Sequence, residues 1–462
     1  MAGEGRPIWI RAPLAVFAKG AEGGVVVRGP TIAELVPAGG SPQTVPAGDC
    51  EVFDASGHVL VPGLVNSHHH FYQTLTRALP AALDKQLFPW LTALYPVWAG
   101  LDPEMIALST RLALAELLLS GCTTACDHHY LYTAEIPEAV DIEVEAAGEI
   151  GIRVVLTRGS MSLSEEDGGL PPRTVVQAED AIMADCERVV ARYHQPGRGA
   201  MVQIALAPCA PWSVSEELMR ETAAYARANG VRLHTHLAET RDETGWCLER
   251  FGKRPLQYLE DFGWLGPDVW LAHGIHFDDD EVRRLGETGT GVAHCPTSNL
   301  YLASGTCRVL ELEAAGAPVG VGVDGSSSND CSNLMQEVRQ AMLVQKHQYG
   351  SERVSHADAL RWATSGSARV LGRDDIGRIA AGAEADLALF RLDEPRFSGH
   401  GDPLAALVVC GAHRADRVMV AGRWRVVDGA IPGLDLDALI ARHSAAARRL
   451  RDRAASAGAL RF

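Results

Sequence analysis

Five residues able to bind a metal ion each stand at the end of a short apolar segment of the chain. They are His68, His70, His236, His273 and Asp324. The segments read VLVPGLVNSHHH (59–70), VRLHTHLAE (231–239), DVWLAHG (268–274) and VGVGVDG (319–325). Imidazole nitrogens together with carboxylate oxygens are ligands of catalytic zinc and of other first-row metals. The pattern therefore predicts a metal centre built from several strand ends.

The spacing of the histidines indicates which of them can bind the metal. His68 and His70 are two residues apart, so on a strand their side chains point the same way and can share a cation. His69 points the opposite way, and we expect it to be packed or bonded to backbone. In VRLHTH, His234 and His236 also share a face. His236 lies nearer the strand end and is the predicted third ligand, whereas His234 is predicted to be a core residue.

Asp324 completes the predicted set with an oxygen ligand. Three histidines and one aspartate, with room for water, describe a catalytic metal site rather than a structural one. A second metal bridged by a modified lysine is not expected. The only lysines are Lys19, Lys85, Lys253 and Lys346, and none lies near ALAPCAPW (205–212), the predicted exit of the fourth strand.

The elements that must position these residues alternate between strand and helix. Short β-branched segments separated by helical stretches such as 103–121 predict βα units and a parallel sheet. We expect strands near 59–67, 122–127, 152–158, 201–207, 231–236, 269–273, 291–294 and 319–323. Eight such units predict an α/β fold, a (β/α)8 TIM-like barrel over residues 61–376. In such a barrel the strand ends converge on one face and gather distant residues into one site.

Both ends of the chain show β character outside the barrel. Residues 1–60 and 377–433 are predicted to form one small β-sandwich domain, because chain termini often lie close together. On the C-terminal side, strand character is expected in ADLALFRL, LAALVVCGAH and RVMVAGRWRVVDG. The last segment, 434–462, has apolar residues at helical spacing and is predicted to be a helix.

Composition excludes several classes of protein. The net charge of −16 disfavours nucleic acid as a partner, since such binding relies on basic patches. No apolar stretch approaches the roughly 20 residues of a membrane helix, so no membrane association is expected. The N-terminus lacks the features of a secretory signal, and we expect a cytoplasmic protein. The ten cysteines form no CxxC pair and are expected to be reduced.

Two known sequence motifs do not apply to this chain. GVGVDG (320–325) matches GxGxxG, but it occurs late in the chain and no acidic residue follows at the offset that dinucleotide binding requires. The HxE and PCxxC signature of cytidine-type zinc deaminases is absent, since Cys209 is followed by Ala, Pro and Trp.

The motifs PGLVNSHHH, HTHLAET, WLAHG, HCPTSNLYLASG and GVGVDGSSSND resemble the amidohydrolase superfamily, in the branch with guanine deaminase, chlorohydrolases and related aminohydrolases. The resemblance spans nearly the whole chain. HHHFYQTLTRALPAA, LFPWLTALYPVW and GHGDPLAALVVCG look like 8-oxoguanine deaminases in particular. Asn66 departs from the pattern, because the superfamily more often has Asp before the histidine pair.

This resemblance implies roles for the residues already singled out. His68, His70, His236 and Asp324 match the residues that hold the metal, Glu239 matches the carboxylate that shuttles protons, and His273 matches the histidine that hydrogen-bonds the water on the metal. The implied reaction is hydrolytic release of ammonia from the exocyclic amino group of a free purine base, with 8-oxoguanine converted to urate as the first choice. One divalent metal is expected, zinc or alternatively iron. Asp324 and His273 would then orient the attacking water and receive its proton.

The substrate residues are less defined by sequence. Gln73 matches a substrate-contacting glutamine of guanine deaminases, Trp90 could stack on a planar base, and Cys209 with Trp212 could shape the rim. Plain packing is the alternative for each. His129, Asn299 and Ser326 also fall in strand-end loops and receive no role.

Other functions remain open at this point. The chain could act on guanine, isocytosine, a pterin or a triazine, because spacing cannot decide among these substrates. A non-catalytic barrel that serves as a scaffold is disfavoured by the retention of every metal and proton-transfer residue. The resemblance also implies a homo-oligomer.

Overall fold

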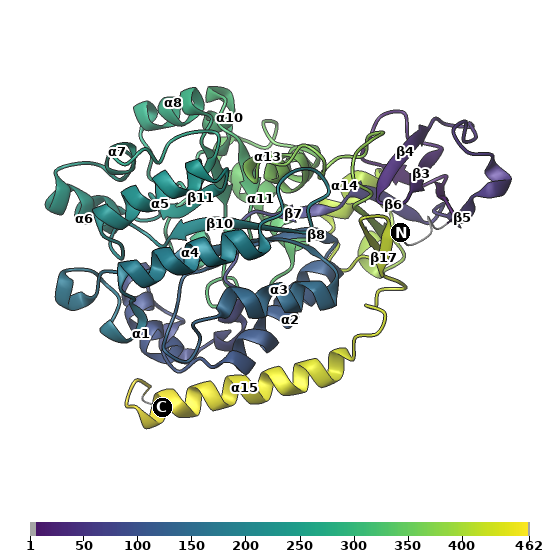
Figure 1. Ribbon diagram of the computed structural model, residues 1–462. Coiled ribbons are helices and arrows are strands. Elements are labelled where there is room, and N and C mark those ends of the chain that lie inside the picture. Colours follow the sequence, from purple (N-terminus) through teal and green to yellow (C-terminus); the bar gives the residue numbers. More distant parts are fainter. Residues whose placement is uncertain (1–5, 461–462) are drawn as a thin grey trace.

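The computed structural model describes residues 6–460 and contains the predicted barrel (Figure 1). Eight parallel strands form one sheet in which each strand pairs with its neighbour in sequence. They are β7 (Leu64–Asn66), β8 (Cys122–His129), β9 (Arg153–Ser160), β10 (Val202–Pro208), β11 (Arg232–Leu237), β12 (Val269–His273), β13 (Gly291–His294) and β14 (Val319–Val321). The first and last strands close the ring where the Ser67 amide donates to the Val321 carbonyl at 3.0 Å and the Asp324 amide donates to the His68 carbonyl at 3.1 Å.

Helices on the outside of the barrel follow most strands. The chain between β7 and β8 holds the 3-10 helix η2 (Phe71–Thr76), α1 (Leu87–Trp98) and α2 (Pro103–Leu119). The later helices are α3 (Ala139–Ile150), α4 (Glu179–Tyr193), α5 (Glu216–Ala228), α6 (Arg241–Phe251), α7 (Pro255–Glu260), α8 (Asp279–Thr288), α9 (Pro296–Tyr301), α10 (Val309–Ala315), α11 (Leu334–Tyr349), α12 (His356–Arg361) and α13 (Ser367–Val370). The core lies between these helices and the strands, as the layers of a barrel require.

Strands from both ends of the chain pack as two sheets beside the barrel (Figure 1). One sheet has the order β4-β3-β1-β5, with β1 (Ile8–Arg11), β3 (Gly24–Arg28), β4 (Thr31–Val36) and β5 (Glu51–Asp54). The other has the order β17-β16-β15-β6-β2, with β2 (Ala15–Val16), β6 (His58–Pro62), β15 (Leu387–Arg391), β16 (Arg417–Val420) and β17 (Arg423–Val426). Ile10, Val25, Leu60, Leu387 and Met419 belong to one buried cluster shared by both sheets. We propose on this basis to treat 1–60 and 377–433 as one composite domain.

The predicted first strand, 59–67, is two strands in the structure. β6 joins the five-stranded sheet and β7 joins the barrel, and Gly63 lies between them. A Cβ atom at Gly63 would stand 2.2 Å from Thr123 Oγ1, so only glycine lets the chain pass this close to β8. The sequence from 59 to 65 is almost entirely apolar, so it gives no signal that the strand is interrupted.

The prediction of strand character in LAALVVCGAH is wrong, because Pro403–Val409 forms helix α14. Asp402 caps this helix by accepting the Ala405 amide, and Pro403 occupies its first turn. Both are standard signals of a helix start. Three apolar residues of α14 (Ala406, Leu407 and Val408) are buried in the main core cluster, so the run is apolar because the helix is packed into the core.

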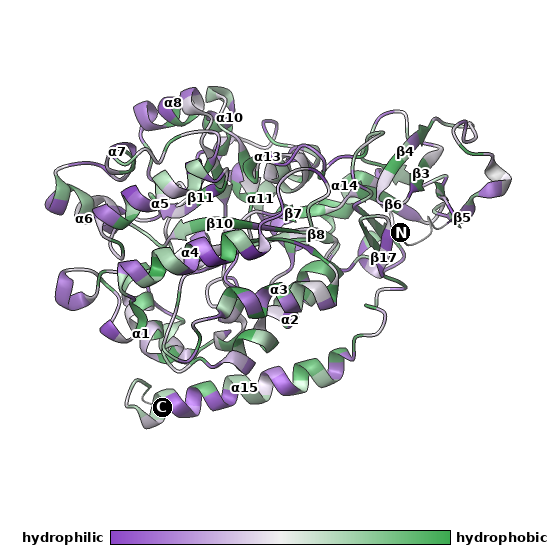
Figure 2. Cartoon of the chain, in the orientation of Figure 1, coloured by the Kyte–Doolittle hydropathy of each residue, from purple (hydrophilic) through white to green (hydrophobic). Residues whose placement is uncertain are grey.

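The predicted C-terminal helix is α15 (Leu436–Ser456), which runs along α2 and the segment from η2 to α1 (Figure 1). Its buried residues Leu439, His443, Ala446, Leu450 and Ala454 recur at helical spacing, and Figure 2 shows hydrophilic residues between them. Leu439 and Leu450 share an apolar cluster with Trp90 and Trp98. The C-terminal helix therefore supports the segment that covers the mouth of the barrel.

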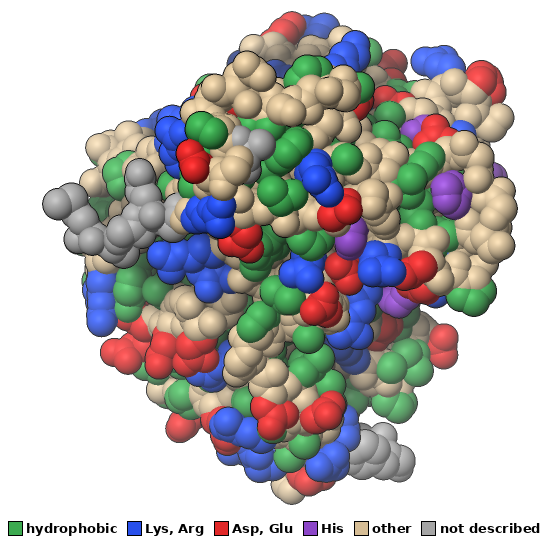
Figure 3. Space-filling view, turned by 90° about the vertical axis from the view of Figure 1, so that its right-hand side faces the viewer, with side chains coloured by type: hydrophobic (Ala, Val, Ile, Leu, Met, Phe, Trp, Pro, Cys, Tyr) green, Lys and Arg blue, Asp and Glu red, His purple; other side chains and the backbone are tan. Residues whose placement is uncertain are grey.

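Figure 3 shows the distribution of side-chain types on one face of the molecule. Acidic and basic side chains are interspersed there. Within residues 6–460, the helices include none whose length and apolar character would let it cross a bilayer.

Candidate metal centre

The predicted ligands all lie at the carboxyl ends of barrel strands. His68 and His70 follow β7, His236 lies in β11, and Asp324 follows β14. His273 is the last residue of β12 and pairs in register with Leu237, the neighbour of His236. His273 and Asp324 both have positive φ, 73° and 63°, a backbone conformation that non-glycine residues rarely adopt. Such strain is held by the surrounding structure and is common at functional sites.

Four side chains meet around one point in the barrel mouth. Asp324 Oδ1 lies 3.3 Å from His68 Nε2 and 3.3 Å from His70 Nε2. His236 Nε2 lies 3.2 Å from His70 Nε2. All four residues are buried. The structure thus brings together the whole predicted ligand set.

Hydrogen bonds behind the rings decide which nitrogen of each histidine carries a proton. The Nδ1 atoms of His70 and His236 lie 2.7 Å from the carbonyl oxygens of His128 and Cys209. A carbonyl oxygen only accepts, so both Nδ1 atoms must donate, and in a neutral ring Nε2 is then left with a lone pair. Both lone pairs face the centre of the site.

The same argument applies to His68 through a second histidine. His234 Nδ1 lies 2.9 Å from the Trp270 carbonyl and must donate to it, which leaves His234 Nε2 as an acceptor. His68 Nδ1, 2.9 Å from His234 Nε2, is therefore the donor. His68 Nε2 is buried and has no hydrogen-bond partner among the described residues. His234 thus does more than the core packing that we expected, because it orients His68.

Three imidazole lone pairs and a carboxylate oxygen face one another with no hydrogen atom between them. Their mutual repulsion is relieved by a cation, and buried groups of this kind are otherwise costly. Buried sets of possible ligand atoms include His68 with His273 and Asp324, and His68 with His128 and His236. The chemistry of the donors therefore fits a metal ion.

His128 was not predicted, although it directly follows the predicted strand 122–127; its Nε2 lies 3.0 Å from the Ala207 carbonyl oxygen.

Two proton-transfer candidates lie beside this set. His273 Nε2 is 3.5 Å from Glu239 Oε2 and 4.0 Å from Asp324 Oδ2. Burial, with the charges of Asp324 and Glu243, raises the pKa of Glu239 well above its usual range. Burial lowers the pKa of His273 to about 3. Asn299 Nδ2, 2.9 Å from His273 Nδ1, holds the orientation of that ring.

Glu243 holds the backbone that carries Glu239. Its Oε1 accepts the Ala238 amide at 2.9 Å and its Oε2 accepts the Glu239 amide at 2.7 Å. Ala238 has a positive φ of 54°, so this turn is strained and needs such support. Glu243 is fully buried, and burial raises its pKa to about 7. Sequence reasoning missed Glu243, and its place in the first turn of α6 was the only signal.

A small cavity of about 30 Å³ adjoins the metal-ligand set. The predicted substrate residues Gln73, Trp90 and Cys209 line it, together with Trp212. Gln73 Oε1 is buried and has no hydrogen-bond partner among residues 6–460, so the amide is available to a ligand. Leu87 and Leu91 of α1 cover the cavity. A bicyclic base is larger than this volume, so the lining would have to open for one to enter.

The remaining histidines and the loop residues have structural contacts. His69 Nδ1 accepts the His70 amide at 2.7 Å, and His69 Nε2 lies 2.8 Å from Ser332 Oγ, in agreement with the expectation of a packed residue. His129 Nδ1 lies 2.8 Å from Glu143 Oε1 in a buried cluster outside the ligand set. Ser326 Oγ lies 3.0 Å from Ser332 Oγ.

Comparisons with known proteins agree with this architecture. A model of the amidohydrolase family matches residues 59–425, and the chain belongs to that family. It is 62% identical over 445 residues to an 8-oxoguanine deaminase of Pseudomonas aeruginosa, which covers 96% of this chain and 98% of the relative. It is 40% identical to an isoxanthopterin deaminase of an unknown prokaryotic organism, over 84% of this chain and 85% of the relative.

A solved structure supports the fold independently. The atrazine chlorohydrolase of Arthrobacter aurescens TC1, crystallised in complex with zinc, superimposes with a TM-score of 0.89. The match covers 95% of this chain and 100% of that chain at 32% identity.

Proposed function

We propose that this chain is a metal-dependent deaminase that hydrolyses 8-oxoguanine to urate and ammonia. The observation that carries the proposal is the 62% identity to an 8-oxoguanine deaminase over nearly the full length of both chains. The convergence of His68, His70, His236 and Asp324 around one point supports the hydrolytic chemistry.

These four residues would hold one divalent metal, with zinc as the first choice and iron as the second. The three unprotonated Nε2 atoms and the carboxylate support this assignment, and the zinc of the chlorohydrolase neighbour favours that metal. When bound, such an ion lowers the pKa of a water ligand to about 7 and supplies hydroxide at neutral pH.

Glu239 and Asp324 would carry the protons, and His273 would orient the water. Because burial raises the pKa of Glu239, its protonated form is favoured, and the carboxyl group can donate that proton to the ring nitrogen beside the exocyclic amino group. His273, kept neutral by burial, would orient the attacking water by donating from Nε2, because its Nδ1 accepts from Asn299. Asp324 would take up the proton of that water and pass it to the leaving amino group. The Glu239 carboxylate would take up the remaining hydroxyl proton as ammonia departs.

Gln73, Trp90 and Cys209 would bind the substrate. The free Gln73 amide can pair with a ring carbonyl and a ring nitrogen, and it lines the same cavity as Glu239. Trp90 Nε1 donates to the Ser327 carbonyl at 3.3 Å, which fixes its ring in the cavity wall. Homo-oligomer formation and a cytoplasmic location stay predictions.

The test is ammonia release from a panel of 8-oxoguanine, guanine, isocytosine, isoxanthopterin and adenine with the metal-loaded protein. We expect the highest kcat/KM with 8-oxoguanine. A pterin is the second candidate substrate, because the chain is 40% identical to an isoxanthopterin deaminase. No ammonia from 8-oxoguanine would refute the proposed substrate, and no ammonia from any member would refute the deaminase itself.

A further inference from the structure

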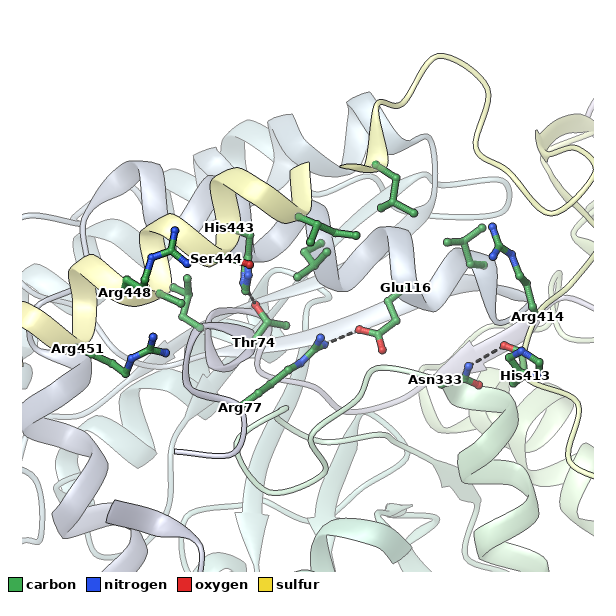
Figure 4. A pocket seen from close by; sticks show the side chains of 16 residues that line it. Thr74, Arg77, Glu116, Asn333, His413, Arg414, His443, Ser444, Arg448 and Arg451 are labelled. Carbon is green, nitrogen blue, oxygen red and sulfur yellow. Dashed lines mark hydrogen bonds and ion pairs between the residues drawn. The ribbon is translucent and has the colours of Figure 1, made fainter. Parts of the chain in front are cut away.

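A second, larger cavity lies on the outside of the barrel between α15, α2 and the chain that follows His70 (Figure 4). Its volume is about 710 Å³, within the range of roughly 300 to 1,000 Å³ that is typical of ligand pockets. It shares no lining residue with the cavity at the metal-ligand set. The proposed catalytic residues therefore give this cavity no role.

The cavity is basic in an acidic protein. Its lining includes Arg77, Arg414, Arg448 and Arg451 but a single carboxylate, that of Glu116. The chain as a whole carries a net charge of −16. A local excess of guanidinium groups favours an anion, and carboxylates and phosphates match the planar guanidinium in geometry.

The arginines of α15 divide into two groups according to the side on which they lie. Arg442 and Arg449 form ion pairs with Glu104, at 3.2 and 2.7 Å. Arg448 and Arg451, which line the cavity, form no ion pair or side-chain hydrogen bond within residues 6–460. The two cavity arginines are therefore available to a ligand, whereas their neighbours already have partners.

The inner wall of the cavity is ordered by direct contacts. His443 of α15 is buried, and its Nε2 lies 3.0 Å from Thr74 Oγ1. Arg77 donates to Glu116 at 2.5 Å, and its Nε is buried with no hydrogen-bond partner among the described residues. Figure 4 shows Arg77 and Glu116 joined below α15. A preformed wall of this kind lowers the cost of ordering side chains when a ligand binds.

Aliphatic side chains form another part of the lining. Leu112 and Leu119 of α2 line the cavity together with Leu436 and Ile440 of α15, and Ile440 is 46% exposed. Covering this apolar surface favours binding of a ligand with an apolar part. The cavity thus combines free guanidinium groups with an apolar wall.

We propose that this cavity binds an amphipathic organic anion, one with a carboxylate or phosphate head and an aliphatic body. The head contacts Arg448 and Arg451, and the body lies against Leu112, Leu436 and Ile440. The proposal is independent of the deaminase reaction, and its test uses no activity measurement.

The experiment is calorimetric titration of metal-loaded, full-length protein with octanoate, octyl phosphate and acetate. We expect octanoate or octyl phosphate, or both, to bind at least tenfold more tightly than acetate, and the tighter of the two identifies the head group. Binding of acetate with the same affinity, or no heat from any probe up to 5 mM, would overturn the proposal.

Variants of α15 locate the site. R448Q/R451Q should weaken binding of the tighter probe at least tenfold, which corresponds to about 1.4 kcal/mol. R442Q/R449Q removes the same charge from the same helix and should change affinity less than twofold. Equal affinities in the two double variants would place the probe elsewhere and refute the site. Both variants alter surface side chains, and thermal unfolding checks that each is folded. Arg77 is left unchanged because it also contacts Ser326 and Ser332 beside the metal centre.

Discussion

His234 Nε2 accepts a hydrogen bond from His68 Nδ1 at 2.9 Å, and this contact turns the other nitrogen of His68 toward Asp324. The Trp270 carbonyl fixes His234 in turn. A residue without direct access to the metal position thereby sets the protonation state of a ligand. Partners of this kind typically contribute 10- to 100-fold to metal affinity.

Replacement of His234 by Gln should therefore weaken metal binding by roughly 10- to 100-fold, because His68 loses its fixed tautomer. Zinc retained after dialysis against graded chelator concentrations measures this change. H294Q is the matched control, since His294 is also a buried histidine of a barrel strand but contacts Gln345 instead of a ligand. Equal zinc retention in the two variants would contradict the role given to His234.

Replacement of Glu239 by Gln should lower kcat by about 10² to 10⁴, because an amide cannot transfer the proton. The metal content, measured by elemental analysis, should be unchanged, since Glu239 is outside the proposed ligand set. Full activity of E239Q would remove this residue from the mechanism.

Replacement of Glu243 by Gln should lower kcat about tenfold or more with little change in KM. The side-chain nitrogen of the new glutamine would face one of the two backbone N–H groups that now donate to the Glu243 carboxylate. Two donors cannot form a hydrogen bond, so the strained turn before Glu239 would move. Steady-state kinetics over a range of pH should also show a shifted apparent pKa for Glu239, because its surroundings change.

E281Q is the control for that variant. Glu281 is likewise a buried carboxylate in the first turn of a helix and accepts the Asp278 amide at 2.9 Å, but it lies outside the cavity at the metal centre. Its kinetics should stay close to wild type. Similar losses in both variants would mean that Glu243 acts only through stability.

Asp375 should make the stability of the protein depend on acid pH. Burial alone would raise its pKa, but hydrogen bonds from Arg373 and the Gly199 amide and the charge of Arg373 lower it to about 2. Its folded-state pKa lies below the ordinary aspartate value of 3.8, so this stabilisation is complete above about pH 4 and is lost as the pH falls toward 2.

At pH 7, D375N should reduce the free energy of unfolding by about 1 to 2 kcal/mol. The difference from wild type should shrink between pH 4 and pH 2.5, as urea unfolding can measure. D374N, at the exposed neighbouring residue, should have little effect at either pH. A difference for D375N that is constant across this range would contradict the assigned pKa.

Much of the fold was predictable because its signals are local. Seven of the eight barrel strands were placed within about two residues, since short β-branched runs between helical stretches have few other interpretations. The two-residue spacing of His68 and His70 also sufficed to put them on one face. Local pattern failed at Pro403–Val409, where the apolar run outweighed the capping signals of Asp402 and Pro403.

The sequence by itself determined which side chains stand at strand ends, because alternation along a strand is set by backbone geometry. Only the tertiary structure decided which of them touch. Three findings depend on contacts between segments far apart or on a turn of unusual φ. They are the orientation of His68 by His234, the contact of Glu243 with the Glu239 amide, and the separation of two sheets at Gly63. Such contacts arise when the barrel closes, and no spacing along the chain encodes the distance between its strands.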